Sequence, residues 1–280
     1  MPVNNVVPIP VRFVEHTHFP VQWGPYTITK EDVSGGDLDK EQKVSILDSR
    51  GVKLWEEDNT SIDSASECSI TGSDKKELRI ITASGGSGMY GNEYYFRREN
   101  GLFMLFSYDF GDSAGITGFA YFDNSPRPEM LVDHSIVDFD GLSHAQRQVY
   151  SCVYKWDGSH YVNVTHEFPH DAHAAGSASQ ASYLKHWREN PTADFNGIDE
   201  DIEGGDSADR ADAIGYWANA MATGDGDTAK NWLLAHANSR LATHLWDIES
   251  DLKNQIPAEG ARLDVIMDNG TNLDKPTKRR

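Results

Sequence analysis

Basic residues are scarce in this sequence of 280 amino acids. It has 25 Lys and Arg against 44 Asp and Glu, which gives a formal net charge of −19 and a pI near 4.8. A surface that binds nucleic acid needs a basic patch, and the one basic cluster here is KRR at 278–280. The composition therefore argues against a nucleic-acid partner, and it favours either a cationic partner or simple solubility.

Cysteine is rare, and long apolar runs are absent. Cys68 and Cys152 make no disulfide framework in a chain of this length, although they could form one bond in an exported protein. No run reaches the roughly 18 apolar residues that a membrane span needs, and the start, MPVNNVVPIPVRFVEH, does not resemble a secretion signal. We expect no membrane span. The location is cytoplasmic as written, or periplasmic or secreted if a signal peptide was removed.

Strand-like runs separated by turn residues occupy the first part of the chain. KVSILDSRGVKLWEE, at 43–57, reads as a hairpin, and Asp157–Gly158 is a strong turn dipeptide between two further runs. Other runs of this kind lie at 77–82, 94–98, 102–108, 129–133, 149–155 and 161–165. The pattern predicts a mostly antiparallel β-rich domain over residues 1–168.

The composition changes after Phe168, where small polar residues give way to helical periodicity. We expect a short helix at 179–189, a helix at 207–221 with Ser207 as N-cap, and an amphipathic helix beginning near Asp227. The apolar stripe of the last helix either packs in the core or forms an interface. The predicted class is α+β: an antiparallel β-rich unit, followed by a helical region with an acidic loop over 169–280.

One pattern occurs twice within residues 70–165. ELRIIT corresponds to EMLVDH, and RRENGLF corresponds to YKWDGSHY. These segments resemble the degenerate FG-GAP or VCBS-type repeats of bacterial exported β-proteins. The resemblance implies a scaffold that is either propeller-like or built of sheets, although two copies are too few to close a propeller.

Repeats of that family often carry an aspartate-rich calcium loop before the Glu and apolar pair. Here the corresponding turns are TGSDKKEL and FDNSPRPEM, in which lysine, proline and arginine stand where anionic ligands would be needed. We therefore expect no calcium at these turns, and no cofactor.

Three histidines, His166, His170 and His173, form the densest group of candidate metal ligands, and Asp171 could orient one of them. The segment contains Pro169 and lacks the helical register of established zinc motifs. A surface loop with incidental histidines is the alternative interpretation.

A nucleophile could be built from Cys152 with His134, His144 or His160. However, Cys152 lies in an apolar strand, where a small buried thiol is the usual occupant.

Carboxylates that could form a glycosidase-like pair are Glu129, Asp133, Asp138 and Asp140. In a chain this acidic such pairs also arise by chance.

The stretch DFNGIDEDIEGGDSADRAD, at 194–212, holds eight carboxylates and one arginine. It lacks the ligand order of an EF-hand. It is either a solvated loop or a docking surface for a basic protein. The residues that would bind the partner are Asp199, Glu200, Asp201, Glu203, Asp206 and Asp209.

The leading hypothesis is a non-catalytic acidic binding protein of bacterial origin, of the inhibitor or immunity type, that neutralises a cationic secreted enzyme or toxin. One alternative is a hydrolase that acts on carbohydrate, or a metal-assisted hydrolase that uses the cluster His166–His173. Another is a carbohydrate-binding module whose aromatic surface would comprise Tyr90, Tyr94, Tyr95, Trp156 and Tyr161.

Overall fold

The structure is a computed structural model that describes residues 9–32, 42–71, 76–83, 91–111, 115–136, 139–142, 147–168, 208–236, 239–267 and 272–274. The strands are β1 (Ile9–Pro10), β2 (Val14–His16), β3 (Val21–Trp23), β4 (Tyr26–Asp32), β5 (Gln42–Leu47), β6 (Lys53–Cys68), β7 (Glu77–Ala83), β8 (Gly91–Arg98), β9 (Leu102–Asp109), β10 (Gly115–Tyr121), β11 (Glu129–Ile136), β12 (Gln148–Trp156), β13 (Tyr161–Asn163) and β14 (Ile266–Met267). The helices are η2 (Thr165–Glu167), α3 (Ala208–Ala222), α4 (Gly226–His236), α5 (Ser239–Asp247) and α6 (Glu249–Gln255).

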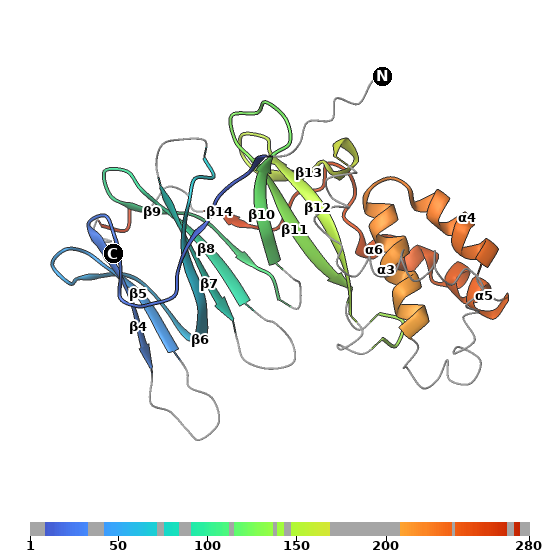
Figure 1. The fold of residues 1–280 in the computed structure, drawn as a ribbon, viewed down its shortest axis with the longest axis horizontal. Helices are drawn as coiled ribbons and strands as arrows, with labels where there is room; N and C mark the ends of the chain where they lie inside the picture. The colour runs from blue at the N-terminus through green and yellow to red at the C-terminus, as the bar shows by residue number, and fades with distance from the viewer. Residues whose placement is uncertain are drawn as a thin grey trace, which may run out of the picture. The chain divides into compact units, whose positions relative to one another are not determined.

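The strands form antiparallel sheets, as the sequence predicts (Figure 1). The α-helices follow β13 along the chain, and the short strand β14 comes after them. One sheet has the order β1-β10-β11-β12-β13. The other has the order β14-β9-β8-β7-β6-β5-β4-β3, with β2 paired to β6. Within the described residues both sheets are open, so the propeller-like alternative is wrong and the sheet alternative is confirmed. The two copies of the repeated pattern, called modules below, supply too few strands for the ring of blades that makes a propeller.

The chain divides into two compact units, each built from separate segments. Unit 1 comprises Met1–Ile9, Ile116–Asp123 and Glu129–Leu263. Unit 2 comprises Pro10–Gly115, Asn124–Pro128 and Asp264–Arg280. The domain boundary expected at residue 168 stays a prediction. Residue 168 lies inside unit 1, which groups the second module of the repeat with the helices.

The core of unit 2 is made by alternating side chains of its long sheet. Its fully or almost fully buried members include Trp23, Ile28, Val44, Ile46, Leu78, Ile80 and Phe96. Trp55 packs edge-on against the rings of Tyr94 and Phe96, with ring centroids 4.8 and 4.9 Å apart. Burial of each large apolar side chain contributes roughly 1.5–3 kcal/mol, so this face holds the unit together.

A buried glutamate begins the same strand in both modules of the repeat. Glu77 and Glu129 are each 0 % exposed. The Glu77 carboxylate accepts a hydrogen bond from the backbone N–H of Ile70 at 3.0 Å, and that of Glu129 accepts one from Phe122 at 3.0 Å. In each module the donor lies seven residues before the glutamate. The glutamate therefore closes the turn that joins two strands, which gives the repeated Glu and apolar pair a structural role.

The turn of the second module has its own cation. The Asp123 carboxylate accepts a hydrogen bond from Lys155 Nζ at 2.5 Å. Asp123 was one of the few acidic residues left in these degenerate turns, and its charge is compensated by a side chain of the protein.

Helix α3 packs against strand β12 in unit 1. Ile214 and Trp217 are almost fully buried, and Asn219 Nδ2 donates to the carbonyl oxygens of Val149 and Gly215, each at 2.9 Å. The predicted helix at 207–221 is confirmed as Ala208–Ala222.

The single amphipathic helix predicted from Asp227 onward is wrong, because the described chain forms α4, α5 and α6 in its place. The predicted stripe nevertheless holds buried residues, since Leu245 and Leu252 are 1 % and 0 % exposed. Apolar periodicity indicates which side chains face the core, and it does not indicate whether the helix is continuous.

Candidate functional site

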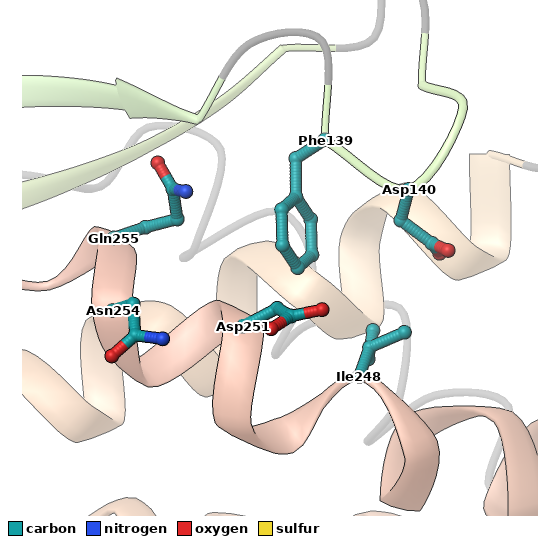
Figure 2. Close-up of a pocket in the computed structure, with 6 residues that line it drawn as sticks. All are labelled: Phe139, Asp140, Ile248, Asp251, Asn254 and Gln255. Atoms are coloured by element: carbon teal, nitrogen blue, oxygen red, sulfur yellow. The ribbon is translucent and has the colours of Figure 1, made fainter.

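A pocket of about 370 Å³ lies in unit 1, between the turn at 139–142 and helix α6 (Figure 2). It is lined by Phe139, Asp140, Ile248, Asp251, Asn254 and Gln255. Figure 2 shows Phe139 pointing from the turn toward α6, with Asp251 on the helix across from the ring. Volumes of this order are typical of small-ligand sites.

The turn has the two positive φ angles and the hydrogen bond that are typical of a type I′ turn, and these fix the backbone of its two pocket residues, Phe139 and Asp140. Asp140 and Gly141 have φ values of 54° and 70°, and the Leu142 N–H donates to the Phe139 carbonyl oxygen at 3.0 Å. Asp–Gly is a preferred central pair for such a turn, because both residues tolerate positive φ. Phe139 and Leu142, which flank this central pair, are buried. Asp140 is therefore held at the rim of the pocket.

Helix α5 supplies the group that orients Asp140. His244 Nε2 donates to Asp140 Oδ2 at 2.6 Å, and the two side chains are 17 % and 13 % exposed. A carboxylate held by such a bond has little freedom to rotate. The bond therefore fixes one wall of the pocket.

Helix α6 forms the opposite wall with one of its faces. At 100° per residue, Ile248, Asp251 and Gln255 share a face. Leu252 is fully buried beside it, and the Gln255 carbonyl oxygen accepts a hydrogen bond from the Tyr150 hydroxyl of β12 at 2.7 Å. The helix is thus anchored at its middle and at its C-terminal end, which presents Asp251 on a fixed backbone.

The lysines near this helix are engaged on its other face. Lys253 Nζ donates to Glu249 Oε1 at 2.7 Å, and Lys230 donates to the other oxygen of the same carboxylate. The hydrogen bonds from Lys230 and then Lys253 hold the pKa of Glu249 below its usual range. Lys230 also lies over the ring of Trp246, with Nζ 3.8 Å from the centroid. Neither lysine lines the pocket.

The pocket combines two carboxylates, two carboxamides, an aromatic ring and an alkyl side chain. Carboxylate and carboxamide oxygens accept hydrogen bonds from a cation, and the ring and alkyl group pack against an apolar stem. The lining thus suits a cationic group carried on an aliphatic chain.

The predicted docking residues Asp199, Glu200, Asp201, Glu203 and Asp206 lie outside the described residues. Asp209 lies in the first turn of α3. The backbone therefore places the end of the acidic stretch at the start of a helix that packs on β12.

The three candidate metal ligands are described only in part. His166 lies in η2, and its Nδ1 is 3.8 Å from a carboxylate oxygen of Glu259. His170 and His173 lie outside the described residues. Where the structure describes the chain, no three His, Cys, Asp or Glu side chains gather as a metal site.

Cys152 is fully buried, and burial raises the pKa of its thiol to about 12. His134 lies on the neighbouring strand, where its Nε2 bonds to the Tyr154 hydroxyl at 2.9 Å and its ring stacks on Tyr150. His160 bonds to the hydroxyl of its neighbour Ser159, and His144 lies outside the described residues. A thiol with so high a pKa stays protonated and is a poor nucleophile.

Three of the four candidate carboxylates lie in the described residues, and each of them has a different setting. Glu129 closes its buried turn, and Asp133 accepts a hydrogen bond from Ser151, while burial raises the pKa of Asp133. Asp138 lies outside the described residues, and Asp140 lines the pocket.

The predicted aromatic surface is largely interior. Tyr94, Tyr95 and Tyr161 are buried, Trp156 packs edge-on against Tyr161 with ring centroids 5.2 Å apart, and Tyr90 lies outside the described residues.

Sequence reasoning missed the α6 wall of the pocket. The Asp140–Gly141 dipeptide is a recognisable turn signal, and Asp251 with Gln255 has the spacing of one helical face. Nothing in the sequence pairs these two segments, which are more than a hundred residues apart.

Both cysteines are free and buried, and no described helix is long and apolar enough to cross a membrane.

Comparisons with family models, with curated proteins and with solved structures each found no match. The resemblance to FG-GAP or VCBS-type repeats stays a prediction.

Proposed function

We propose that this chain is a non-catalytic acidic binding protein that neutralises a cationic protein, such as a secreted enzyme or toxin. In this proposal it acts as an inhibitor or immunity-type protein of bacterial origin. The acidic stretch at 194–212 draws the partner in, and the pocket beside α6 engages it.

The observation that carries the proposal is the charge of the pocket. Asp140 and Asp251 face it from two walls, and no lysine or arginine is among its lining residues. The net charge of −19 has the same sign, so long-range attraction and local contact favour one class of partner.

The test begins with the full chain immobilised and used to isolate a binding protein, which is identified and purified. We expect a basic protein that binds with nanomolar affinity, loses its own activity when bound, and binds much more weakly as NaCl is raised. Affinity indifferent to salt, or a partner whose activity is unchanged by binding, would overturn the proposal.

A matched pair of variants separates the acidic stretch from net charge. One changes Asp199, Glu200 and Asp201 to Asn, Gln and Asn. The other makes the same kind of change at three exposed acidic residues of unit 2, Glu15, Glu31 and Asp264. We expect the first to slow association on the order of tenfold and the second to slow it much less. Equal effects would assign the attraction to net charge alone.

The metal-assisted hydrolase is a second proposal, which rests on the half-exposed His166. Metal analysis of the purified chain tests it directly. Stoichiometric zinc that is lost on changing His166, His170 and His173 to alanine would favour it over the binding protein.

A further inference from the structure

We propose that the pocket beside α6 receives the guanidinium group of an arginine side chain. The inference rests on the proposed function, because the arginine would belong to the cationic partner. It names the group that enters the pocket.

The walls match the hydrogen-bonding pattern of a guanidinium. This group is planar and carries five N–H donors, so it needs acceptors on more than one side. Asp140 supplies carboxylate oxygens from the turn, and Asp251 supplies them from α6. The carboxamides of Asn254 and Gln255 add two further oxygen acceptors on the helix.

The two carboxylates are held differently, which suits a site that is partly formed before binding. Asp140 is fixed by His244 at 2.6 Å and is mostly buried. Asp251 is exposed at its position on α6. The fixed carboxylate of Asp140 orients the ligand, and the exposed carboxylate of Asp251 completes its contacts. Few side chains of the protein therefore need to be ordered on binding.

The apolar lining distinguishes arginine from lysine. Phe139 offers a ring and Ile248 offers an alkyl surface. Guanidinium stacks on aromatic rings and is weakly hydrated, whereas an ammonium is a compact and strongly hydrated charge. Arginine therefore loses less solvation than lysine in such a pocket, and arginine is a frequent anchor at interfaces.

The test is a titration of the full chain with blocked arginine amide, followed by calorimetry or NMR. We expect saturable binding of this probe, weaker binding of blocked lysine amide, and none of blocked citrulline amide, which has a similar shape without the charge. Citrulline binding as strong as arginine binding would overturn the inference.

Variants on α6 and next to it locate the site. Asp251→Asn should weaken binding of the arginine probe about tenfold, because the carboxamide keeps one oxygen acceptor but loses the negative charge that strengthens its bond to a guanidinium. Gln255→Ala provides a second variant in the same wall. Asp247→Asn is the matched control, because it removes one exposed carboxylate that does not line the pocket. Equal weakening by Asp247→Asn and Asp251→Asn would contradict the proposal.

The inference and the proposed function fail in different ways. If the purified partner binds Asp251→Asn as tightly as the natural chain and the arginine probe does not bind, the pocket inference is wrong and the binding function stands. If the probe and free alkylguanidinium compounds bind while no basic protein does, the proposed function is wrong. The guanidinium that enters the pocket would then belong to a small molecule and not to a protein.

Discussion

His134 shows how burial turns one side chain into a pH-dependent element of stability. Its ring is enclosed by Tyr150 and Tyr154, and burial lowers its pKa to about 4. In the unfolded chain the pKa of a histidine is about 6.5, so the unfolded state takes up the proton first as the pH falls. The contribution of His134 to stability is therefore fully present above about pH 6.5 and is lost as the pH falls toward 4.

We expect the free energy of unfolding to depend less on pH in His134→Gln than in the natural chain. The shift from about 6.5 to about 4 corresponds to about 3 kcal/mol. Urea denaturation of both proteins at pH 7 and pH 4.5 measures the difference. An equal loss of stability on acidification in the two proteins would contradict this role of His134.

Glu129 illustrates a buried acidic side chain used for structure. We expect Glu129→Ala to lower the free energy of unfolding by about 2–4 kcal/mol, because the Phe122 N–H loses its acceptor and a cavity remains. Glu167→Ala, at an exposed glutamate of the same unit, should stay within about 0.5 kcal/mol. Chemical denaturation of both variants provides the comparison, and similar losses would show that Glu129 is not a special position.

At the scale of elements, one carboxamide links α3 to β12 beside their apolar contact. Asn219→Ala removes the donor to the Val149 and Gly215 carbonyl oxygens. We expect a loss of about 1–3 kcal/mol and faster amide hydrogen exchange in α3 and β12. Asn231→Ala, at an exposed residue of α4, is the matched control. Unchanged exchange in Asn219→Ala would mean that apolar packing alone holds α3.

Most strands could be predicted because local signals define them. The hairpin at 43–57 becomes β5 and the start of β6, and Asp157–Gly158 joins β12 to β13. Gly158 has a φ of 109°, which explains why glycine stands there. Alternation and turn residues are read over a few positions, so a single sequence suffices for them.

The candidate site could not be predicted in the same way. The sequence groups Asp140 with Glu129, Asp133 and Asp138, which lie near it in the chain. Its partner in the structure is His244 on α5, and its companion across the pocket is Asp251 on α6. Contacts between such distant segments depend on tertiary packing, which local periodicity does not encode. The splitting of the C-terminal helices escaped prediction for the same reason.

At the scale of the whole molecule, the excess of negative charge should weaken the folded state at low ionic strength. Carboxylates repel one another across the surface, and raising the ionic strength from about 0.01 M to about 1 M shortens the screening length from roughly 30 Å to roughly 3 Å. We expect the melting temperature to rise with NaCl over this range. Calorimetry measures it, and a melting temperature that falls would indicate that attractive surface pairs outweigh the repulsion.

Unit 2 draws its strands from both ends of the sequence. Strand β14 pairs with β9, with Ile266 opposite Ser107 and Met267 opposite Phe106. Further along, the Leu273 N–H donates to the Leu102 carbonyl oxygen at 2.8 Å. Until β14 pairs with it, the free side of β9 exposes unpaired backbone N–H and C=O groups, which form an open template for pairing with other chains. Docking of β14 is therefore the step that protects this side of β9 from aggregation.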